Sequence, residues 1–368
     1  MKALSLEEIE EKRKRLLSLM EENDYEYVVI GRRDNFAWFT GGGDNKVIIN
    51  RECGEAFLVI DRENIRLIAY QMDGQRFLDE QVQNIKPEYI FLKWYESPLE
   101  DFVARLIKGK KTLSDVLIEG AYYSPSSFFK VQYPLSISEI QRLQWLGEVS
   151  EKILKSAADF ASPGMKEYEI AGFLLDEYTK LGIECDVLMV GSDERIFKYR
   201  HPLPSEKKIQ EYLFLHTSAR KWGLHANITR LVSFGKVPQE IQRRYEIVTT
   251  IEGVVFSLCK VGTRFLDVLN EQKRLYKELG FEEEWENHFH GGLTGYTVID
   301  TSICMDPNEK IKLYQPFDWF ITITGVKVEE LTLITPKGLE VSSVTGIWPM
   351  KRYEFDTCVF DLPVIFCK

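Results

Sequence analysis

The sequence of 368 residues predicts an α/β protein of two domains, residues 1–135 and residues 136–368. Three observations support this fold class. The length suffices for two hydrophobic cores. The first third alternates helical and strand patterns, and the second domain contains an internal repeat of helix and strand signals. With 44% hydrophobic and 28% charged residues, the composition is that of an ordered globular protein.

The first domain has the patterns of a small α/β fold. Turn residues separate five short apolar runs, which predict strands at residues 27–30, 47–49, 57–60, 65–70 and 116–118. Residues 98–108 have the apolar spacing of a helix. A loop-like stretch then leads to Tyr133-Pro134, and a long amphipathic helical pattern begins directly after it. The domain boundary is therefore predicted near residue 135.

The second domain contains the repeat. Segments 164–184 and 262–282 carry glycine, tyrosine, Leu-Gly and glutamate at matching places, 98 positions apart (262 − 164 = 98). Each copy has the pattern of a glycine turn, an amphipathic helix, a glycine stop and a strand. A duplicated α+β half explains this economically. Chance agreement is the alternative, since Leu-Gly is common at helix ends.

Charge and composition exclude some classes of protein. The net charge of −10 argues against a nucleic-acid partner. No apolar run approaches the roughly 18 residues that a membrane span needs. The six cysteines lack C-x-x-C spacing, which is typical of free thiols in a reducing compartment. We therefore expect a cytoplasmic protein that binds neither nucleic acid nor a membrane.

The histidines cluster, which points weakly to chemistry. All five lie in the second domain, at positions 201, 216, 225, 288 and 290. Histidine titrates near neutral pH and binds metals, so such a cluster is a mild sign of a functional site. Any single histidine is more often a surface residue or a hydrogen-bonded core residue.

Six segments then resemble one known family, in the family's order and over nearly the whole chain. They are RDNFAWFTG (33–41), PGMKEYEI (163–170), HPLP (201–204), LHANITR (224–230), HFHGGLTG (288–295) and GVKVEE (325–330). Together they resemble the pita-bread hydrolases: Xaa-Pro aminopeptidase, prolidase and creatinase. The resemblance implies a small creatinase/prolidase-like N-terminal α/β domain followed by a pita-bread domain with pseudo-twofold duplication. It also implies a homodimer.

The resemblance implies a degenerate metal site. Active peptidases of this family hold two metals with two Asp, one His and two Glu. The corresponding positions here are His216, Asn227, Gly292, Thr324 and Glu329. Because two hard divalent cations need several carboxylates, no cofactor is expected, and at most one divalent metal. A single metal on some set of His216, His288, His290 and Glu329 remains an alternative, and aligning His290-Gly291 with the family's His-Gly would restore one ligand.

Creatinase cleaves a C–N bond in this fold without a metal, and three residues match the roles that this chemistry needs. The resemblance assigns His201 as the acid/base, His288 as a stabiliser of a developing oxyanion, and Glu329 as a clamp for substrate or proton. The predicted function is therefore hydrolysis of a C–N bond in a small amide, dipeptide or guanidino-like substrate.

Three further residues are candidates for binding that small-molecule or short-peptide substrate, namely His290, Arg230 and Trp38. Arg230 has a structural alternative, an ion pair that supports its strand. Trp38 has another, a place in the core of the first domain.

Two other functions remain open. The chain could be a catalytically inactive pita-bread protein that binds a peptide or metabolite, as the aminopeptidase-like domain of the histone chaperone FACT illustrates. It could also be a genuine Xaa-Pro metallopeptidase, which would require a different register at several segments at once.

Overall fold

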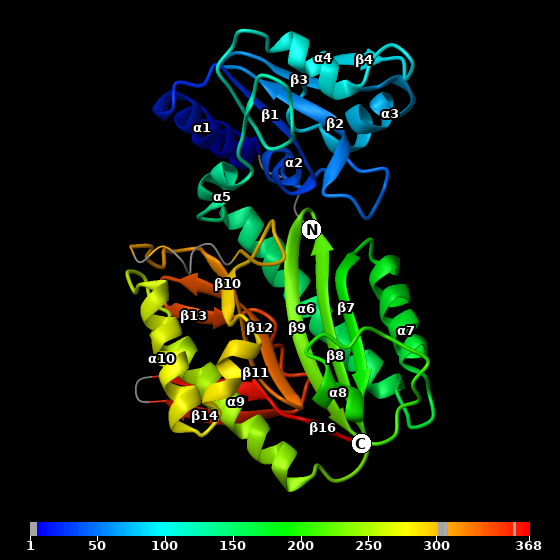
Figure 1. The fold of residues 1–368 in the computed structure, drawn as a ribbon, viewed down its shortest axis with the longest axis vertical. Helices are drawn as coiled ribbons and strands as arrows, with labels where there is room; N and C mark the ends of the chain where they lie inside the picture. Colours follow the sequence, from blue (N-terminus) through cyan, green and yellow to red (C-terminus); the bar gives the residue numbers. More distant parts are fainter. Residues whose placement is uncertain (1–5, 301–305, 307, 356–357) are drawn as a thin grey trace. The chain divides into compact units, whose positions relative to one another are not determined.

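The computed structural model describes residues 6–300, 306, 308–355 and 358–368. The chain forms two compact units (Figure 1). One comprises Met1–Ser138 with Trp222–Leu224, and the other comprises Glu139–Lys221 with His225–Lys368.

The first unit is built around a mixed six-stranded sheet of order β4-β3-β2-β1-β5-β6. Its elements are α1 (Leu6–Glu22), β1 (Tyr27–Arg32), α2 (Arg33–Thr40), β2 (Cys53–Ile60), β3 (Ile65–Tyr70), α3 (Gln71–Arg76), the π-helix η1 (Phe77–Gln81), β4 (Glu88–Leu92), α4 (Leu99–Leu106), β5 (Thr112–Ser114), β6 (Tyr122–Tyr123) and α5 (Ser126–Gln132).

Helix α4 illustrates how sequence spacing makes this core. Leu99, Val103 and Ile107 recur every four residues, so they lie on one face and are buried. They pack with Val29, Phe57 and other strand residues in one hydrophobic cluster. Two predicted strands are absent, however. Residues 47–49 form a bend and turn with exposed side chains, and residues 116–118 form an irregular segment after β5.

The second unit contains two four-stranded sheets, of order β16-β9-β8-β7 and β10-β11-β12-β13. Its elements are α6 (Ile137–Phe160, whose first two residues belong to the first unit), α7 (Glu167–Lys180), β7 (Glu184–Ser192), α8 (Glu194–Lys198), β8 (Tyr212–Lys221), β9 (Leu224–Ser233), α9 (Gln239–Leu258), α10 (Phe265–Glu278), the 3-10 helix η2 (Glu282–Asn287), β10 (Gly291–Leu293), β11 (Pro316–Ile323), β12 (Val326–Thr335), β13 (Gly338–Val341), β14 (Met350–Phe355), β15 (Cys358–Pro363) and β16 (Phe366–Cys367).

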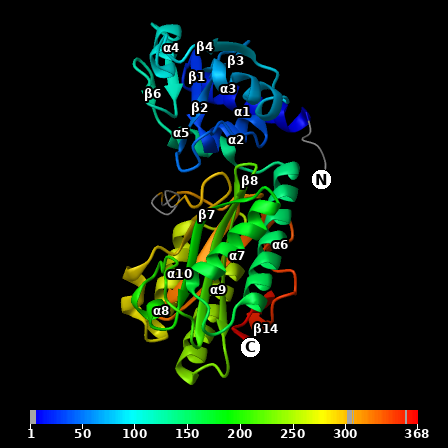
Figure 2. The same cartoon turned by 90° about the vertical axis from the view of Figure 1, so that its right-hand side faces the viewer.

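Helices cover these sheets. Helix α7 packs on β7, and α9 packs on β11 and β12 (Figures 1 and 2). Strands β8, β9 and β11 are buried along almost their whole length, which explains why they lack a simple alternation of apolar and polar residues. A sheet with side chains buried on both faces can hold polar groups between its layers only where they pair with each other.

The predicted repeat is visible in the backbone. Gly164 and Gly262 have φ of 91° and 90°, in the left-handed region that favours glycine. Each donates its N–H over 2.8 Å to a carbonyl 45 to 49 residues later, that of Ile209 (209 − 164 = 45) or Ile311 (311 − 262 = 49). One helix follows each turn, α7 in the first copy and α10 in the second.

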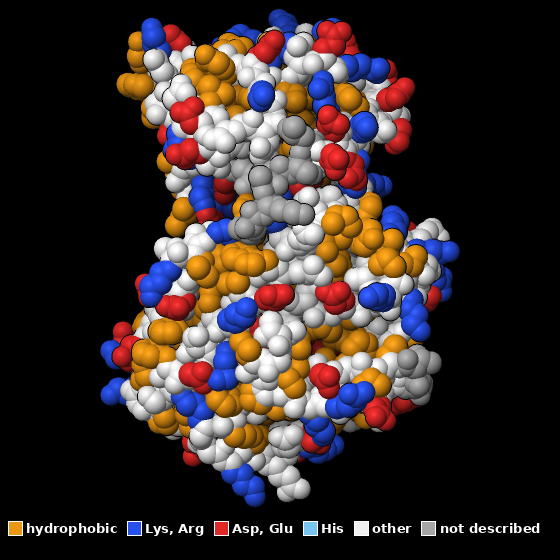
Figure 3. Space-filling view, turned by 180° about the vertical axis from the view of Figure 1, so that it is seen from behind, with side chains coloured by type: hydrophobic (Ala, Val, Ile, Leu, Met, Phe, Trp, Pro, Cys, Tyr) orange, Lys and Arg blue, Asp and Glu red, His pale blue; other side chains and the backbone are white. Residues whose placement is uncertain are grey.

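The surface carries mixed charge. On the face drawn in Figure 3, acidic and basic side chains are interspersed over both units. None of the helices in the described part of the chain is long and apolar enough to cross a membrane.

Candidate active site

A pocket of about 190 Å³ lies within the second unit. Ligand sites for drug-sized molecules measure roughly 300–1,000 Å³, so this pocket has room only for a ligand smaller than a typical drug. Its residues come from β7, β8, β9, β11, β12, the loops around His201 and His288, and the segment that follows β10. They are Val187, Met189, His201, His216, Asn227, His288, Phe289, Val298, Ile299, Asp318, Phe320, Lys327 and Glu329.

Strand alternation aims the polar residues into this pocket. Phe320 and Glu329 face each other across the β11–β12 ladder, so they share one face of the sheet. Asp318 and Lys327 lie two residues from these and therefore point the same way. We call this face of the β11–β12 hairpin the floor of the pocket. It carries two acids, Asp318 and Glu329, and one lysine, Lys327.

Glu329 is the centre of the polar floor. Its Oε2 accepts a hydrogen bond from Thr229 Oγ1 at 2.5 Å, and it lies 2.7 Å from His216 Nδ1 and 2.8 Å from Lys327 Nζ. All of these side chains are almost fully buried. Burial opposes ionisation of Glu329, but His216 and Lys327 hold its pKa well below the ordinary value. Glu329 is therefore an anion paired with the Lys327 ammonium.

Asp318 has the opposite environment. It is fully buried and hydrogen-bonds to Glu329. Burial and the negative charge of Glu329 raise its pKa well above the ordinary value. Two carboxyl groups in contact share a proton for this reason, so Asp318 is neutral and donates to Glu329.

His201 and His288 form a pair on the wall of the pocket. Their Nε2 atoms are 3.1 Å apart. His288 Nδ1 bonds to the carbonyl oxygen of Phe289, which can only accept, so Nδ1 carries the proton of the neutral ring. His288 Nε2 must then accept from His201 Nε2–H. This leaves the lone pair of His201 on Nδ1.

The surroundings of both imidazoles favour their neutral form. His201 is exposed overall, but the partial burial of its ring, assisted by the charge of Lys327, lowers its pKa; the same causes lower the pKa of the more buried His288 to about 3. A neutral imidazole is a base at physiological pH. The pair can therefore take up a proton on His201 Nδ1 while His288 holds the ring in place.

The structure brings together His201, His288 and Glu329, the three residues predicted to be catalytic, with two further positions that the resemblance aligns with metal ligands, His216 and Asn227. It does not bring in Thr324. The Thr324 hydroxyl bonds to Arg200 at 3.2 Å in the turn after β11, outside the pocket. Gly292 pairs with Asp318 on β10, and a Cβ there would lie 2.4 Å from the Asp300 carbonyl oxygen.

The three predicted substrate-binding residues lie elsewhere. His290 stacks on Trp285 with ring centroids 3.8 Å apart, and its Nε2 bonds to the Trp285 carbonyl at 2.7 Å. Burial lowers the pKa of His290 to about 4. Trp38 is fully buried in α2 of the first unit. Neither side chain is among the residues that line the pocket.

Arg230 points to the other face of β9 from Asn227 and Thr229. It donates to Glu330 Oε1 at 2.5 Å and lies 3.4 Å from Glu151 of α6. It is fully buried, so it holds a charged cluster between sheet and helix. This is the ion-pairing alternative that the sequence left open.

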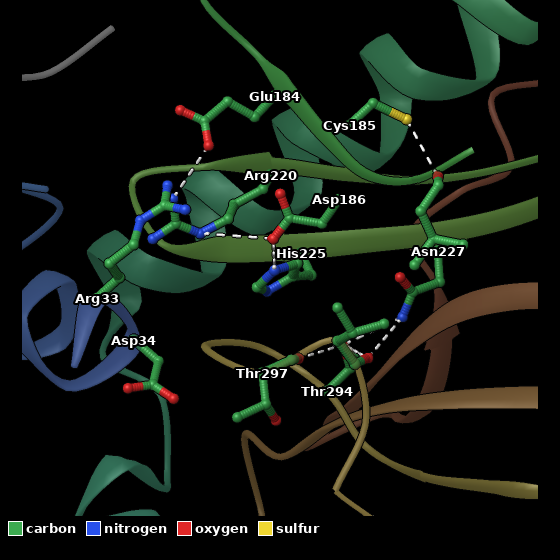
Figure 4. A network of polar contacts seen from close by, with 12 residues as sticks. Arg33, Asp34, Glu184, Cys185, Asp186, Arg220, His225, Asn227, Thr294 and Thr297 are labelled. Atoms are coloured by element: carbon green, nitrogen blue, oxygen red, sulfur yellow. Dashed lines mark hydrogen bonds and ion pairs between the residues drawn. The ribbon is translucent and has the colours of Figure 1, made fainter. Parts of the chain in front are cut away.

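Figure 4 shows what orients the β9 side chains. Asn227 Nδ2 donates to the Val298 carbonyl at 2.8 Å and to Thr294 Oγ1 at 3.3 Å. His225 bonds through Nε2 to Asp186 at 3.0 Å and through Nδ1 to the Gly295 carbonyl at 2.8 Å. Asn227 Oδ1 is thereby left without a hydrogen-bond partner among the described residues, and both ring nitrogens of His225 are engaged by these neighbours.

Sequence reasoning missed Asp318 and Lys327. The β12 segment Val326-Lys327-Val328-Glu329 alternates apolar and charged residues, and this signal could have placed Lys327 beside Glu329. Asp318 had no comparable signal, because its place depends on the pairing of β10, β11 and β12.

Comparison with known proteins identifies the family. The model of metallopeptidase family M24 matches residues 141–335, more than half of the chain. The chain belongs to the M24 family. The chain is 22% identical over 215 residues to an uncharacterized peptidase of Staphylococcus haemolyticus, covering 55% of this chain and 60% of that protein. The match thus spans only about three fifths of this curated relative.

Solved structures show the same fold. The Xaa-Pro dipeptidase of Bacillus anthracis is 16% identical, with a TM-score of 0.75 over 98% of this chain and 100% of that chain. The X-Pro aminopeptidase of Thermotoga maritima is 17% identical, with a TM-score of 0.76 over 97% and 99%. The predicted pita-bread fold with its N-terminal α/β domain is confirmed. The chain is thus an M24 protein with the fold of these solved Xaa-Pro peptidases.

M24 proteins usually bind divalent metals. Within the ranges that the structure describes, no three His, Cys, Asp or Glu side chains are placed to hold a metal ion. Whether the residues that are present fit such an ion depends on the charges around Glu329.

Proposed function

We propose that this M24 protein hydrolyses a C–N bond in a small amide, dipeptide or guanidino-like substrate without the dinuclear metal centre of its family. The observation that carries the proposal is the His201–His288 pair beside a floor that already contains a cation, Lys327. His201 would act as the base, with His288 and Glu329 in support.

The residues present do not fit two divalent metals. Glu329 Oε2 already accepts from Thr229, His216 and Lys327, so its lone pairs are engaged. The Lys327 ammonium would repel a divalent cation bound to the same carboxylate, by several kcal/mol at about 4 Å with an effective dielectric near 20. A neutral Asp318 adds no negative charge. These points support a degenerate site, and no step below passes through a metal.

The chemistry can be written with this chain's own groups. His201 Nδ1 takes a proton from water, and the water oxygen attacks the carbon of the C–N bond. The substrate oxygen or nitrogen that gains negative charge is stabilised by the Lys327 ammonium, which lines the pocket. The His201 imidazolium then gives its proton to the leaving nitrogen. Water is thereby divided into the new C–O bond and the new N–H bond.

Turnover and metal content test this proposal together. The purified protein is incubated with EDTA or with Mn²⁺, desalted, and assayed for amine or ammonia release from small amides, Xaa-Pro dipeptides and guanidino compounds. We expect release that EDTA does not abolish, with a loss of about 10²–10⁴-fold in His201→Ala. His225→Gln is the matched control, because its ring binds Asp186 outside the pocket.

Two results would contradict the proposal. About two Mn²⁺ retained per chain, with Xaa-Pro cleavage that depends on them, would establish the metallopeptidase alternative. Unchanged turnover in His201→Ala would remove the proposed base.

A binding protein without activity is the second candidate. It is favoured by one observation: Lys327, Glu329, His216 and Thr229 satisfy one another, as in a site that is not poised for reaction. This candidate predicts that small molecules raise the melting temperature while none is turned over.

Two assignments remain proposals. All five cysteines in the described ranges are free, which supports a reducing compartment such as the cytoplasm. A homodimer is proposed from the family resemblance, and light scattering in solution tests it.

A further inference from the structure

Two buried oxygen atoms in the pocket lack a hydrogen-bond donor. Asn227 Oδ1 and Asp318 Oδ1 have no partner among the described residues, although the two side chains are only 1% and 2% exposed. Both residues line the pocket. A buried acceptor without a donor costs about 1–3 kcal/mol, so a ligand that supplies donors here gains affinity.

The orientation of both groups is set by neighbouring residues. Asn227 Nδ2 donates to the Val298 carbonyl and to Thr294, the second of which is drawn in Figure 4. Its Oδ1 has no partner in the described part of the chain and is the atom left for a ligand. The Asp318 carboxyl hydrogen-bonds to the side chains of Glu329 and Asn227, and Oδ1 is its oxygen without a partner among those residues. Its Oδ1 accepts hydrogen bonds whether or not the carboxyl is protonated. The pocket therefore presents two adjacent acceptors.

The charge and the apolar lining of the pocket further restrict the class of ligand that fits. Lys327 lies on the same floor, and its ammonium disfavours a second cation there. Much of the rest of the wall is apolar, including Val187, Met189 and Phe320. An NH₂ group offers two donors to the two acceptors, whereas a hydroxyl offers one.

We propose that the pocket recognises an uncharged NH₂ group, as in a primary carboxamide with a short apolar chain, through Asn227 Oδ1 and Asp318 Oδ1. The inference rests on the proposed function in taking this pocket as the substrate site, and it deepens that function by naming the substrate class. It concerns binding, so it can fail independently of hydrolysis.

Calorimetric titration of the full chain tests it with isosteres. The probes are butyramide and isovaleramide, their N,N-dimethyl amides, and the corresponding carboxylates. We expect the primary amides to bind at least about tenfold more tightly than the dimethyl amides, which corresponds to about 1.4 kcal/mol. The dimethyl amides lack N–H donors, and the carboxylates leave both acceptors facing negative charge.

Variants at Asp318 sharpen the test. Asp318→Leu removes the acceptor and is expected to weaken primary amide binding about tenfold or more. Asp318→Asn keeps one acceptor oxygen and one donor toward Glu329, so binding should be largely retained. If Asp318→Leu does not fold, the binding of the ligand series to the unaltered protein and to Asp318→Asn still tests the inference.

The inference would be overturned if dimethyl and primary amides bound equally well, or if the carboxylates bound more tightly than the primary amides. It would also be overturned if no primary amide bound at concentrations up to about 10 mM, since a Kd above that concentration means a very small binding free energy. Primary amide binding without turnover would support the inference and count against hydrolysis. Turnover of substrates that lack N–H donors would overturn the inference and leave the hydrolase proposal standing.

Discussion

The two halves of the pita-bread unit have the same backbone conformation at their hairpins but place different residue types in the pocket. Strands β8 and β9 turn at Trp222-Gly223, and β11 and β12 turn at Thr324-Gly325. The two glycines both have positive φ, 79° and 94°. The hairpins are therefore equivalent, 102 positions apart (325 − 223 = 102).

Counted from these glycines, the pocket residues fall in matching places. His216 and Asp318 precede their glycine by seven residues (223 − 216 and 325 − 318), and Asn227 and Glu329 follow theirs by four. Lys327 corresponds to His225. The first hairpin thus supplies neutral groups, and the second supplies the charged pair and a buried acid. The two hairpins thus place side chains at matching positions, while the residue types there make the floor electrostatically asymmetric.

Removing the charge of the second hairpin should have the largest effect on stability. Glu329→Leu leaves the buried Lys327 without a counter-charge, and we expect a loss of about 3–5 kcal/mol in the free energy of unfolding. Its equivalent in the first hairpin, Asn227→Leu, breaks only neutral hydrogen bonds and should cost about 1–3 kcal/mol. Urea denaturation measures both.

The double variant Lys327→Met/Glu329→Leu is the control, and it should recover most of the loss because no buried charge remains. If the double variant were as unstable as Glu329→Leu, the ion pair would not be the cause.

The equivalent pair Lys327 and His225 should differ sharply in activity. Lys327→Met removes the proposed stabiliser of developing charge and should lower kcat/KM about 10²–10³-fold on an identified substrate. His225→Leu, on the other hairpin, should stay near the unaltered value. A comparable loss in both variants would mean that the halves contribute alike, contrary to the asymmetry described above.

The pH profile of kcat/KM should reflect the same asymmetry. His201 must be unprotonated to act as a base, and burial together with Lys327 lowers its pKa. Activity should therefore persist below pH 6.5, the ordinary histidine value, and be lost as the pH falls through the lowered pKa of His201. Lys327→Met removes one cause, so the acid limb should move to higher pH. An acid limb that stays in place would assign it to another group.

The smallest expected effect tests the equivalence of the halves directly. Gly164 and Gly262 have similar positive φ, and an added Cβ would meet open space at both, so alanine at either position should cost about 1–2 kcal/mol from the backbone alone. Gly172→Ala, within helix α7, is the control and should stabilise by about 0.5–1 kcal/mol. Unequal losses at Gly164 and Gly262, measured by thermal unfolding, would show that the two turns are not interchangeable.

Local signals were enough to predict the fold. The glycine turns at 164 and 262, the helical spacing after each, and the ordered family segments all act over short stretches of chain. The family resemblance alone made His201, His288 and Glu329 candidates, and the structure brings them to one pocket. Their roles in catalysis remain predictions.

The sequence by itself therefore determined the family, the fold and the residue types that could stand at a metal site, because these depend on residue identity and local periodicity. Only the tertiary structure decided which side chains share the pocket. The register of Phe320 opposite Glu329 puts Asp318, not Thr324, beside Glu329. Strand alternation places Arg230 on the face of β9 opposite Asn227, where it pairs with Glu330. The ring of His290 stacks on Trp285. Such choices depend on strand pairing and on which buried polar group finds a partner, and both are set by residues distant in the chain.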